Sequence, residues 1–378
     1  MNTRYLAFFF SAILFYACNP KPSVLSDFYI DSFSEESNSS LFEDVFSDIR
    51  VVPLDLGEHV LGSTMALHVE RAEGGYLITD RQTNTIYYLD QQGSLITYLS
   101  KVGRGPGEYN SLQYCKYKDH RLIALADGTH IIEYTVKGEL VKETFMEEDI
   151  MDFFPFGGQE YALFLYRYNG ESDLEDRVII TDSSFVKKRS YLPLTYQLFN
   201  YGSYISSVTG DEGQFLCIQQ SRPELYKCDK DTVVTTYHYD FNGKEYPKTM
   251  LEVDDFEPML DILMGTPDIY GLVNVFENQE YLFQAVCHLV DGEEKRIGQW
   301  VIDKRDMSSR IEYWDLDGPE FQFFGPPQML TENNEVVYVC DLSLIDNVKD
   351  MIPGLTKIEQ ENKGKVTDAM LLFCKIGE

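Results

Sequence analysis

The amino-acid sequence predicts an all-β fold, a six-bladed β-propeller with four-stranded antiparallel blades. Three observations predict it. A pattern of four short strands separated by polar turns recurs along the chain. The recurrence has a period of roughly 40 to 50 residues, which is typical of propeller blades. One isolated strand precedes the first repeat, and the last repeat is one strand short.

Each repeat consists of a strand, a polar turn, a second strand, a loop, a third strand, a turn and a last strand. The clearest copy runs from Met65 to Leu99, and the next runs from Leu112 to Phe145. The first strand of the second copy, residues 112–118, alternates as a half-buried strand does. Longer spacings between the later copies indicate insertions. The first residues after the inner turns of the six copies are Tyr76, Arg121, Tyr161, Phe215, Tyr281 and Val336.

The isolated strand spans residues 48–54, and the sixth repeat ends with a strand at residues 369–376. Pairing of these two strands would supply the missing fourth strand, close the ring and leave no exposed sheet edge. A two-domain β-sandwich would also give short strands between turns, but it would not account for the recurring inner turn or for the isolated strand. Helices are predicted only at residues 254–264 and 342–361, both in insertions.

The first 17 residues predict export. Arg4 supplies a positive charge, and residues 5–17 form an apolar run that is too short to span a membrane but suits a signal peptide. The small residue Ala17 before Cys18 resembles a bacterial lipoprotein cleavage site, which makes Cys18 the expected site of lipid attachment. Ordinary secretion with an incidental cysteine is the alternative.

The domain boundaries follow from composition. Residues 1–17 are the expected signal peptide, residues 18–44 a lipidated N-terminus and flexible tether, and residues 45–378 the propeller domain. The tether assignment rests on prolines, serines and acidic residues, which bury little apolar surface. We therefore expect an outer-membrane lipoprotein that faces the periplasm or the cell exterior, with the membrane as a partner through the lipid.

The formal net charge is −30 at pH 7. This acidic excess argues against nucleic acid and anionic lipid surfaces as partners. The charge is spread along the chain without an acidic block, so solubility is its simplest role. The six cysteines after Cys18 have no zinc-binding spacing. Cys217 and Cys228 flank one predicted turn and are the one pair that we would test for a disulfide.

The glycine-rich stretch LSKVGRGPGEYN, residues 99–110, is not a nucleotide-binding loop. A P-loop has a lysine and a hydroxyl residue after its last glycine, whereas Glu108 and Tyr109 follow here. Pro106 also removes one of the N–H donors that a phosphate would use. The residues that follow alternate like a strand, so the stretch is predicted to join the last strand of one blade to the innermost strand of the next.

The GRGPGEY loop, followed by a strand, a polar turn, LIALAD and HIIEYTVKGELV, resembles one NHL-type propeller repeat. Over residues 45–376 the chain resembles the Bacteroidetes-type six-bladed β-propeller lipoproteins, which are NHL-repeat-like and TolB-like propellers. The shared features are the lipoprotein start, an early strand like IRVVPLD, the VGRGPGEY loop, and a YPKTM-plus-helix insertion before the fifth blade. The family is largely of unknown function, so the resemblance implies a fold and a compartment more than an activity.

One rim of the central channel is the expected place for a binding site. Successive turns of an antiparallel blade alternate between two faces, so loops between strands two and three share a face with loops between blades. Such loops on a rigid scaffold often carry function. The alternative is that the acidic residues cap strand ends through bonds to the backbone, and that the arginine of the glycine loop pairs with a nearby acid. The candidate residues are Asp80, Arg81, Arg104, Glu108 and Asp127.

No catalytic motif stands out in the sequence. The six histidines lack metal-binding spacing, and there is no GxSxG nucleophile motif. We therefore expect a non-catalytic binding or scaffolding module for a protein, peptide or glycan, without a cofactor. The alternative is a metal-dependent hydrolase, lyase or lactonase that holds a divalent cation in the central channel, for which Asp80, Asn84 and Asp127 would have to serve as ligands. Propellers host both kinds of function.

Overall fold

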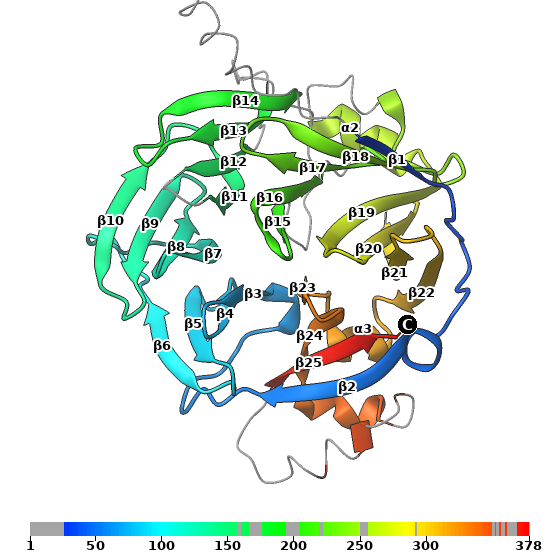
Figure 1. The fold of residues 1–378 in the computed structure, drawn as a ribbon, viewed down its shortest axis with the longest axis horizontal. Coiled ribbons are helices and arrows are strands. Elements are labelled where there is room, and N and C mark those ends of the chain that lie inside the picture. The colour runs from blue at the N-terminus through cyan, green and yellow to red at the C-terminus, as the bar shows by residue number, and fades with distance from the viewer. Residues whose placement is uncertain are drawn as a thin grey trace, which may run out of the picture.

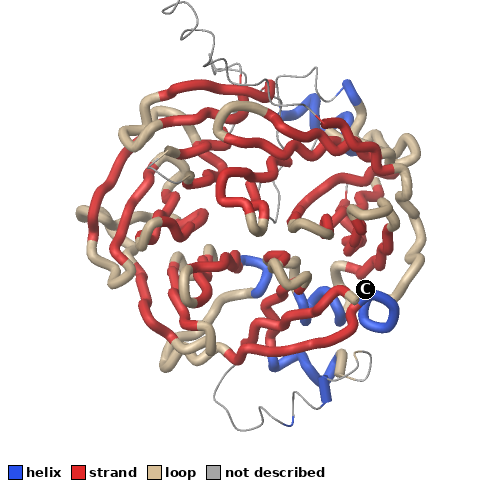
Figure 2. The backbone as a smooth tube through the Cα atoms, in the orientation of Figure 1, coloured by secondary structure: helices blue, strands red, loops and turns tan. Residues whose placement is uncertain are grey.

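The computed structural model describes residues 26–156, 160–165, 176–193, 205–218, 222–249, 256–291, 293–349, 352, 355–356, 360 and 369–377. Strands dominate these residues, and helices occur only in connections (Figure 2). The strands form short sheets around a common centre, each with one strand near the centre and one at the periphery (Figure 1). The predicted all-β, propeller-like fold is confirmed. The predicted signal peptide and Cys18 lie outside the described residues.

Three four-stranded antiparallel sheets follow one another in chain order. In each sheet the first strand lies nearest the centre and the fourth lies at the periphery (Figure 1). The strands are β3 (Leu67–Ala72), β4 (Gly75–Asp80), β5 (Thr85–Asp90) and β6 (Leu95–Ser100), then β7 (Leu112–Lys118), β8 (Arg121–Ala126), β9 (His130–Thr135) and β10 (Leu140–Phe145), then β11 (Ile150–Pro155), β12 (Tyr161–Leu165), β13 (Asp176–Thr181) and β14 (Lys187–Pro193).

The sequence of each strand matches its position in the sheet. The middle strands β4 and β5 are buried at almost every position and read GYLITD and TIYYLD. Such nearly continuous apolar runs suit strands that are covered on both faces. The outer strand β6, which reads LITYLS, instead alternates between partly buried and exposed residues. The repeat that was visible in the sequence therefore reflects the change in burial from the centre to the periphery.

Two further groups of four antiparallel strands share one nine-stranded sheet. A single parallel bridge between Val208 and Glu277 joins them near the centre. The ninth strand, β1 (Ser26–Ile30), pairs parallel with the outer strand β18. The two groups are β15 (Ile205–Val208), β16 (Asp211–Ile218), β17 (Glu224–Asp229) and β18 (Val233–Tyr239), and β19 (Asp268–Glu277), β20 (Tyr281–Val290), β21 (Glu293–Asp303) and β22 (Ser309–Asp315).

The last sheet combines strands from both ends of the described chain. β2 (Phe46–Pro53) pairs antiparallel with β25 (Ala369–Ile376), and the sheet continues through β24 (Glu335–Asp341) to β23 (Met329–Leu330). The structure therefore contains the predicted pairing of the isolated N-terminal strand with the C-terminal one. Arg50 on β2 reaches across β25 and donates two hydrogen bonds, of 2.5 and 2.9 Å, to the Glu335 carboxylate. Its guanidinium also lies 3.6 Å from the centre of the Phe373 ring.

Aromatic side chains fill the space between neighbouring sheets. Tyr76 on β4 packs against Phe373 on β25, with ring centres 5.8 Å apart. Phe154 on β11 stacks on Phe215 on β16 at 5.3 Å. Such pairs contribute beyond their buried area because of the ring quadrupole, and they fix each sheet against the next.

We call residues 26–45 the N-terminal segment. Their composition predicted a flexible tether, but in the structure they are folded against the sheets. After β1 the segment passes along the outside of the β19–β22 group to reach β2 (Figure 1). Phe33 is 7% exposed, and its ring centre lies 4.8 to 5.6 Å from those of Phe241, Tyr270 and Trp300. Leu41 is fully buried and begins a single helical turn, Leu41–Val45.

The polar residues of the N-terminal segment cover the edge of β22. Asn38 Oδ1 accepts a hydrogen bond of 2.9 Å from the Ile311 N–H, and Ser37 Oγ accepts one of 3.0 Å from the Tyr313 N–H. An exposed strand edge would otherwise present unpaired backbone groups. The serine-rich polar residues of this segment therefore cover the strand edge, and buried apolar side chains such as Phe33 and Leu41 hold the segment in place.

Replacing Phe33 by alanine is expected to release the N-terminal segment while the ring stays folded. Removal of a buried phenylalanine typically costs about 3–5 kcal/mol, and here the loss falls on the docking of residues 26–45. Hydrogen exchange should then speed up in residues 26–45 but not in β4. Phe28→Ala is the matched control, because Phe28 is 43% exposed. Unchanged exchange in the Phe33 variant would contradict the role assigned to this side chain.

Helices are few. α2 (Phe256–Met264) agrees with the helix predicted at residues 254–264. The helix predicted at residues 342–361 begins as a short 3₁₀ turn, Leu342–Asn347, and most of its remainder lies outside the described residues. The short α3 (Pro319–Phe324) was not predicted, and a 3₁₀ turn, Thr64–Ala66, precedes β3. Cys217 and Cys228 lie on the neighbouring strands β16 and β17 as buried free thiols, so the structure contains no bridge between them.

Candidate functional site

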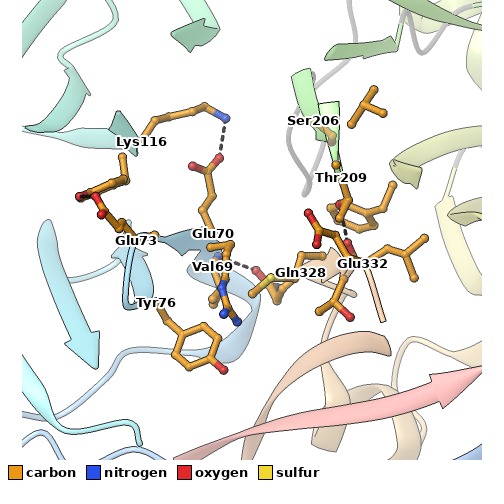
Figure 3. Close-up of a pocket in the computed structure, with 18 of the residues that line it drawn as sticks. Val69, Glu70, Glu73, Tyr76, Lys116, Ser206, Thr209, Gln328 and Glu332 are labelled. Atoms are coloured by element: carbon orange, nitrogen blue, oxygen red, sulfur yellow. Dashed lines mark hydrogen bonds and ion pairs between the residues drawn. The ribbon is translucent and has the colours of Figure 1, made fainter. Parts of the chain in front are cut away.

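A cavity of about 1090 Å³ lies where the inner strands meet the turns at one end of the ring (Figure 3). Its walls come from β3, β7, β15 and β23 and from the turns that follow these strands. The volume suits a small molecule or part of a larger ligand. Because these turns join the first strand of a sheet to the second, the cavity opens on the side opposite the loops between blades, and we call this the cavity side.

Four ionisable residues from three neighbouring inner strands meet beside one wall of the cavity, and three of them, His68, Glu70 and Lys116, line it. The Lys116 ammonium on β7 lies 2.8 Å from Glu70 Oε1 on β3 and 3.5 Å from Asp152 Oδ1 on β11. His68 Nε2 lies 3.1 Å from the same Glu70 oxygen. The Lys116 and Asp152 side chains are 2% and 0% exposed. We call these four residues the charged cluster.

The charges of Glu70 and Lys116 are fixed at neutral pH. Burial alone would raise the pKa of Glu70, but attraction to Lys116 and a hydrogen bond from His68 outweigh it and lower the pKa to about 2. Burial would lower the pKa of Lys116, yet Asp152 and Glu70 raise it well above its usual range. Each charge is therefore stabilised by its neighbours, as a buried charge must be.

The opposite wall is held by hydrogen bonds between sheets. The Val69 N–H on β3 donates to Gln328 Oε1 at 3.0 Å, and Thr209 Oγ1 donates to the Leu330 carbonyl at 2.6 Å (Figure 3). These bonds connect sheets that are far apart in the sequence and make the wall rigid. Ser206 on β15 also lines the cavity. It is 7% exposed, and its Oγ has no hydrogen-bond partner among the described residues.

The mouth of the cavity carries exposed charges. Glu73 Oε2 accepts a hydrogen bond of 3.0 Å from the Tyr117 hydroxyl and lies 3.1 Å from His120 Nδ1. Burial and this hydrogen bond raise the pKa of Tyr117 to about 12. Glu332 and Asp119 are exposed in the turns around the opening. The mouth therefore presents several carboxylates to a ligand.

The predicted acidic residues of the other rim organise turns. Asp80 ends β4 and is fully buried; its carboxylate accepts hydrogen bonds from the N–H groups of Gly62, Gln82 and Thr83 at 2.7 to 3.1 Å. Asp127 has a positive φ of 53°, and its carboxylate accepts hydrogen bonds from the N–H groups of Asn110 and Ser111. This is the capping arrangement that the sequence analysis held as the alternative.

The remaining predicted rim residues lie on the same side of the ring. Arg81 donates to the carbonyls of Ala66 and Met65 at 3.4 Å. Glu108 closes its own loop by accepting the Gly105 N–H at 2.7 Å, and Arg104 is exposed.

The loop between β4 and β5 contacts the loop between β6 and β7, as predicted. The Tyr109 hydroxyl in the second loop donates a hydrogen bond of 3.0 Å to the Asn84 carbonyl in the first. None of the five predicted residues lines the cavity. A ligand role for them remains a prediction.

The sequence matches one family model, described as a domain of unknown function (DUF4934), over residues 27–369. The chain belongs to this family. No protein of curated function matches the chain in sequence. The DUF4934 match begins one residue after the start of β1 and ends at the first residue of β25, so it covers all the strands between them.

Solved structures resemble this DUF4934 chain in fold. A predicted exported protein from Bacteroides fragilis has a TM-score of 0.73 and 14% sequence identity, and the match covers 94% of this chain and 100% of that one. A member of the DUF4221 family from Bacteroides vulgatus has a TM-score of 0.54 and 10% identity, with 88% and 97% covered. At these identities the likeness concerns the fold alone. No helix in the part of the chain that the structure describes is long and apolar enough to cross a membrane.

The sequence analysis of this DUF4934 chain missed the charged cluster. Its residues lie on three different predicted innermost strands, and no local motif connects them. A signal was nevertheless present, because Glu70, Lys116 and Asp152 each place a charge within an innermost strand, and Asp152 is the one polar residue in its strand, IMDFFP. An ionisable residue inside such a strand needs a partner, and here the partners lie on neighbouring sheets.

Metal binding finds no support in this geometry. Among the described residues, no three histidine, cysteine, aspartate or glutamate side chains are grouped so that they could hold a metal ion. The predicted ligands Asp80 and Asp127 use their carboxylates on backbone N–H groups, and the Asn84 Oδ1 accepts the Leu112 N–H at 2.8 Å. These residues shape loops of the opposite side of the ring and lie outside the cavity lining.

Proposed function

We propose that this chain is an exported lipoprotein whose six-bladed propeller binds a protein, peptide or glycan ligand without transforming it. In this proposal the β15–β18 and β19–β22 groups are separate blades, and the pairing of β2 with β25 closes the ring. The ligand occupies the cavity between the charged cluster and the Ser206 wall. The scaffold is rigid there because hydrogen bonds between sheets fix both walls.

The fixed charge of the cluster carries the proposal. A general acid or base works best when its pKa lies near the working pH. Glu70, with a pKa of about 2, stays ionised at neutral pH. Lys116, whose pKa is raised, stays protonated. Neither group exchanges a proton readily near pH 7, so the cluster is suited to recognition more than to proton transfer.

The cellular setting of the proposal is the outer membrane. Cys18 carries the lipid after removal of residues 1–17, and the domain faces the periplasm or the cell exterior. The apolar run before Ala17-Cys18 supports this setting, as does the likeness to a predicted exported protein. The metal-dependent hydrolase, lyase or lactonase alternative has no ligand set in its favour among the described residues.

Filling the cavity mouth is expected to weaken ligand binding strongly. Asn333 is exposed and lines the opening, so Asn333→Trp should place a large ring in the path of a ligand and weaken binding at least about tenfold, which corresponds to about 1.4 kcal/mol. Glycan and peptide arrays probed with labelled Cys18→Ser protein would identify ligands. Mass spectrometry of the recovered ligands would show whether they are unchanged.

Arg104→Trp is the matched control, because Arg104 is exposed on the opposite side of the ring. We expect it to bind as the parent protein does. Equal binding by the parent and the Asn333→Trp variant would show that the cavity is not the site. A chemically altered ligand would show that the protein is an enzyme.

A further inference from the structure

We infer that the ligand of the central cavity carries a positive charge, in the form of an alkylammonium or guanidinium group. This inference rests on the proposed function, since it names the chemistry that the same cavity selects.

Two of the cations that line the cavity, Lys116 and Arg50, are already paired with carboxylates. Lys116 is held between Glu70 and Asp152. Arg50 is held by both oxygens of Glu335. A ligand carboxylate or phosphate would have to compete with these bound carboxylates and would face their negative charge as well. Like charges brought together at an interface act against a wrong partner.

Some hydrogen-bond acceptors that line the cavity have no donor among the described residues. Glu70 makes both of its hydrogen bonds through Oε1, which leaves Oε2 without a partner among the described residues. Across the cavity, the buried Ser206 Oγ also lacks a partner, and Glu332 lies near Thr209 on that wall (Figure 3). A group rich in N–H donors would satisfy such acceptors, and charge-assisted bonds to carboxylates are the stronger kind.

The overall charge of the lining agrees with this assignment. Among the described residues, six carboxylates line the cavity against four lysine and arginine side chains. The six are Glu70, Glu73, Asp119, Asp211, Glu332 and Glu335, and the four are Arg50, Arg71, Lys116 and Lys118. The chain as a whole carries −30. A negative opening on a negative molecule attracts cations over a distance and repels anions.

Calorimetric titration of the Cys18→Ser protein tests the inference. The probes are spermidine, a tri-lysine peptide, a tri-glutamate peptide and the neutral sugar maltotriose. We expect one or both cationic probes to bind, with an affinity that falls as salt is raised to about 0.15 M. Spermidine alone would indicate a small organic cation, and tri-lysine alone would indicate a basic peptide. The acidic peptide and the sugar should give no heat of binding.

Charge reversal at the mouth locates the effect. Glu332→Lys is expected to weaken binding of the cationic probe at least about tenfold, because it removes an attraction and adds a repulsion. Glu147→Lys makes the same charge change at an exposed residue in the connection between β10 and β11, on the opposite side of the ring, and should change affinity less than about twofold.

The outcomes separate this inference from the proposed function. Equal losses in the Glu332→Lys and Glu147→Lys variants would mean general surface attraction and would overturn the inference. Binding of maltotriose or tri-glutamate that disappears in Asn333→Trp would also overturn it, yet would leave the cavity as the binding site. If no probe binds and no array ligand depends on Asn333, both the inference and the proposed function fail.

Discussion

Replacing Lys116 by methionine is expected to lower the free energy of unfolding by about 3–5 kcal/mol at pH 7. The variant leaves Glu70 and Asp152 in the interior without the cation that lies 2.8 and 3.5 Å away from them. A buried carboxylate that has lost its counter-ion is no longer compensated for the hydration that it gave up on folding. Urea denaturation followed by circular dichroism would measure the loss.

The loss of unfolding free energy in the Lys116→Met variant should become smaller as the pH is lowered. The pKa of Glu70 is lowered from 4.5 to about 2 by folding, so its ionisation stabilises the folded state above pH 4.5, and this contribution disappears as the pH falls toward 2. The difference between the parent and Lys116→Met should therefore narrow below pH 4.5. Lys118→Met, two residues further along β7, is the control. Equal and small effects of the two changes would show that the cluster does not stabilise the fold.

Starting the chain at residue 55 is expected to prevent cooperative folding. This truncation removes β2, which pairs with β25 over its whole length, and removes Arg50 from its bidentate pair with Glu335. It also removes the core residues Val52 and Leu54. Losses of this kind together rival the about 5–15 kcal/mol that holds a typical domain together. Thermal unfolding followed by circular dichroism, with size-exclusion chromatography, would show the change.

Two companion chains define which residues matter. A chain that starts at residue 26 keeps all described residues and should melt cooperatively. A chain that starts at residue 46 keeps β2 but loses the N-terminal segment, so it should fold with a lower melting temperature. A peptide of residues 46–54 added to the shortest chain is expected to restore part of the structure. If the chain from residue 55 melts like the chain from residue 26, the pairing of β2 with β25 is dispensable for folding.

The sequence predicted the fold well where local pattern and position in the ring coincide. Nearly continuous apolar residues indicate buried middle strands such as β4 and β5. Aspartates such as Asp80 indicate where strands end. The N-terminal segment was predicted incorrectly for a physical reason. Phe33 is the one aromatic residue in the polar stretch of residues 31–40. The aromatic pocket that receives it is built from residues more than 200 positions away in the sequence, so only the three-dimensional structure reveals it.

The candidate site was harder to predict than the fold. Asp80 and Asp127 were visible because turn chemistry is local, and for the same reason their carboxylates are occupied by neighbouring backbone groups. The charged cluster needs the registers of three inner strands at once. Glu70 lies opposite Leu77, Lys116 opposite Ile123 and Asp152 opposite Phe164, and irregularities in β7 and β11 shift the count by a residue. Spacing in the sequence alone does not reveal that these three meet.

Folding of the N-terminal segment also sets how far the domain can stand from a membrane. In the proposed lipoprotein, about eight residues separate the lipid on Cys18 from Ser26, and they span at most about 28 Å when fully extended. A free linker up to residue 45 would have spanned about 90 Å. The docking of Phe33 and Leu41 therefore confines the propeller to a thin layer beside the bilayer. Within that layer it meets ligands that diffuse along the membrane, and partners further away have to come to it.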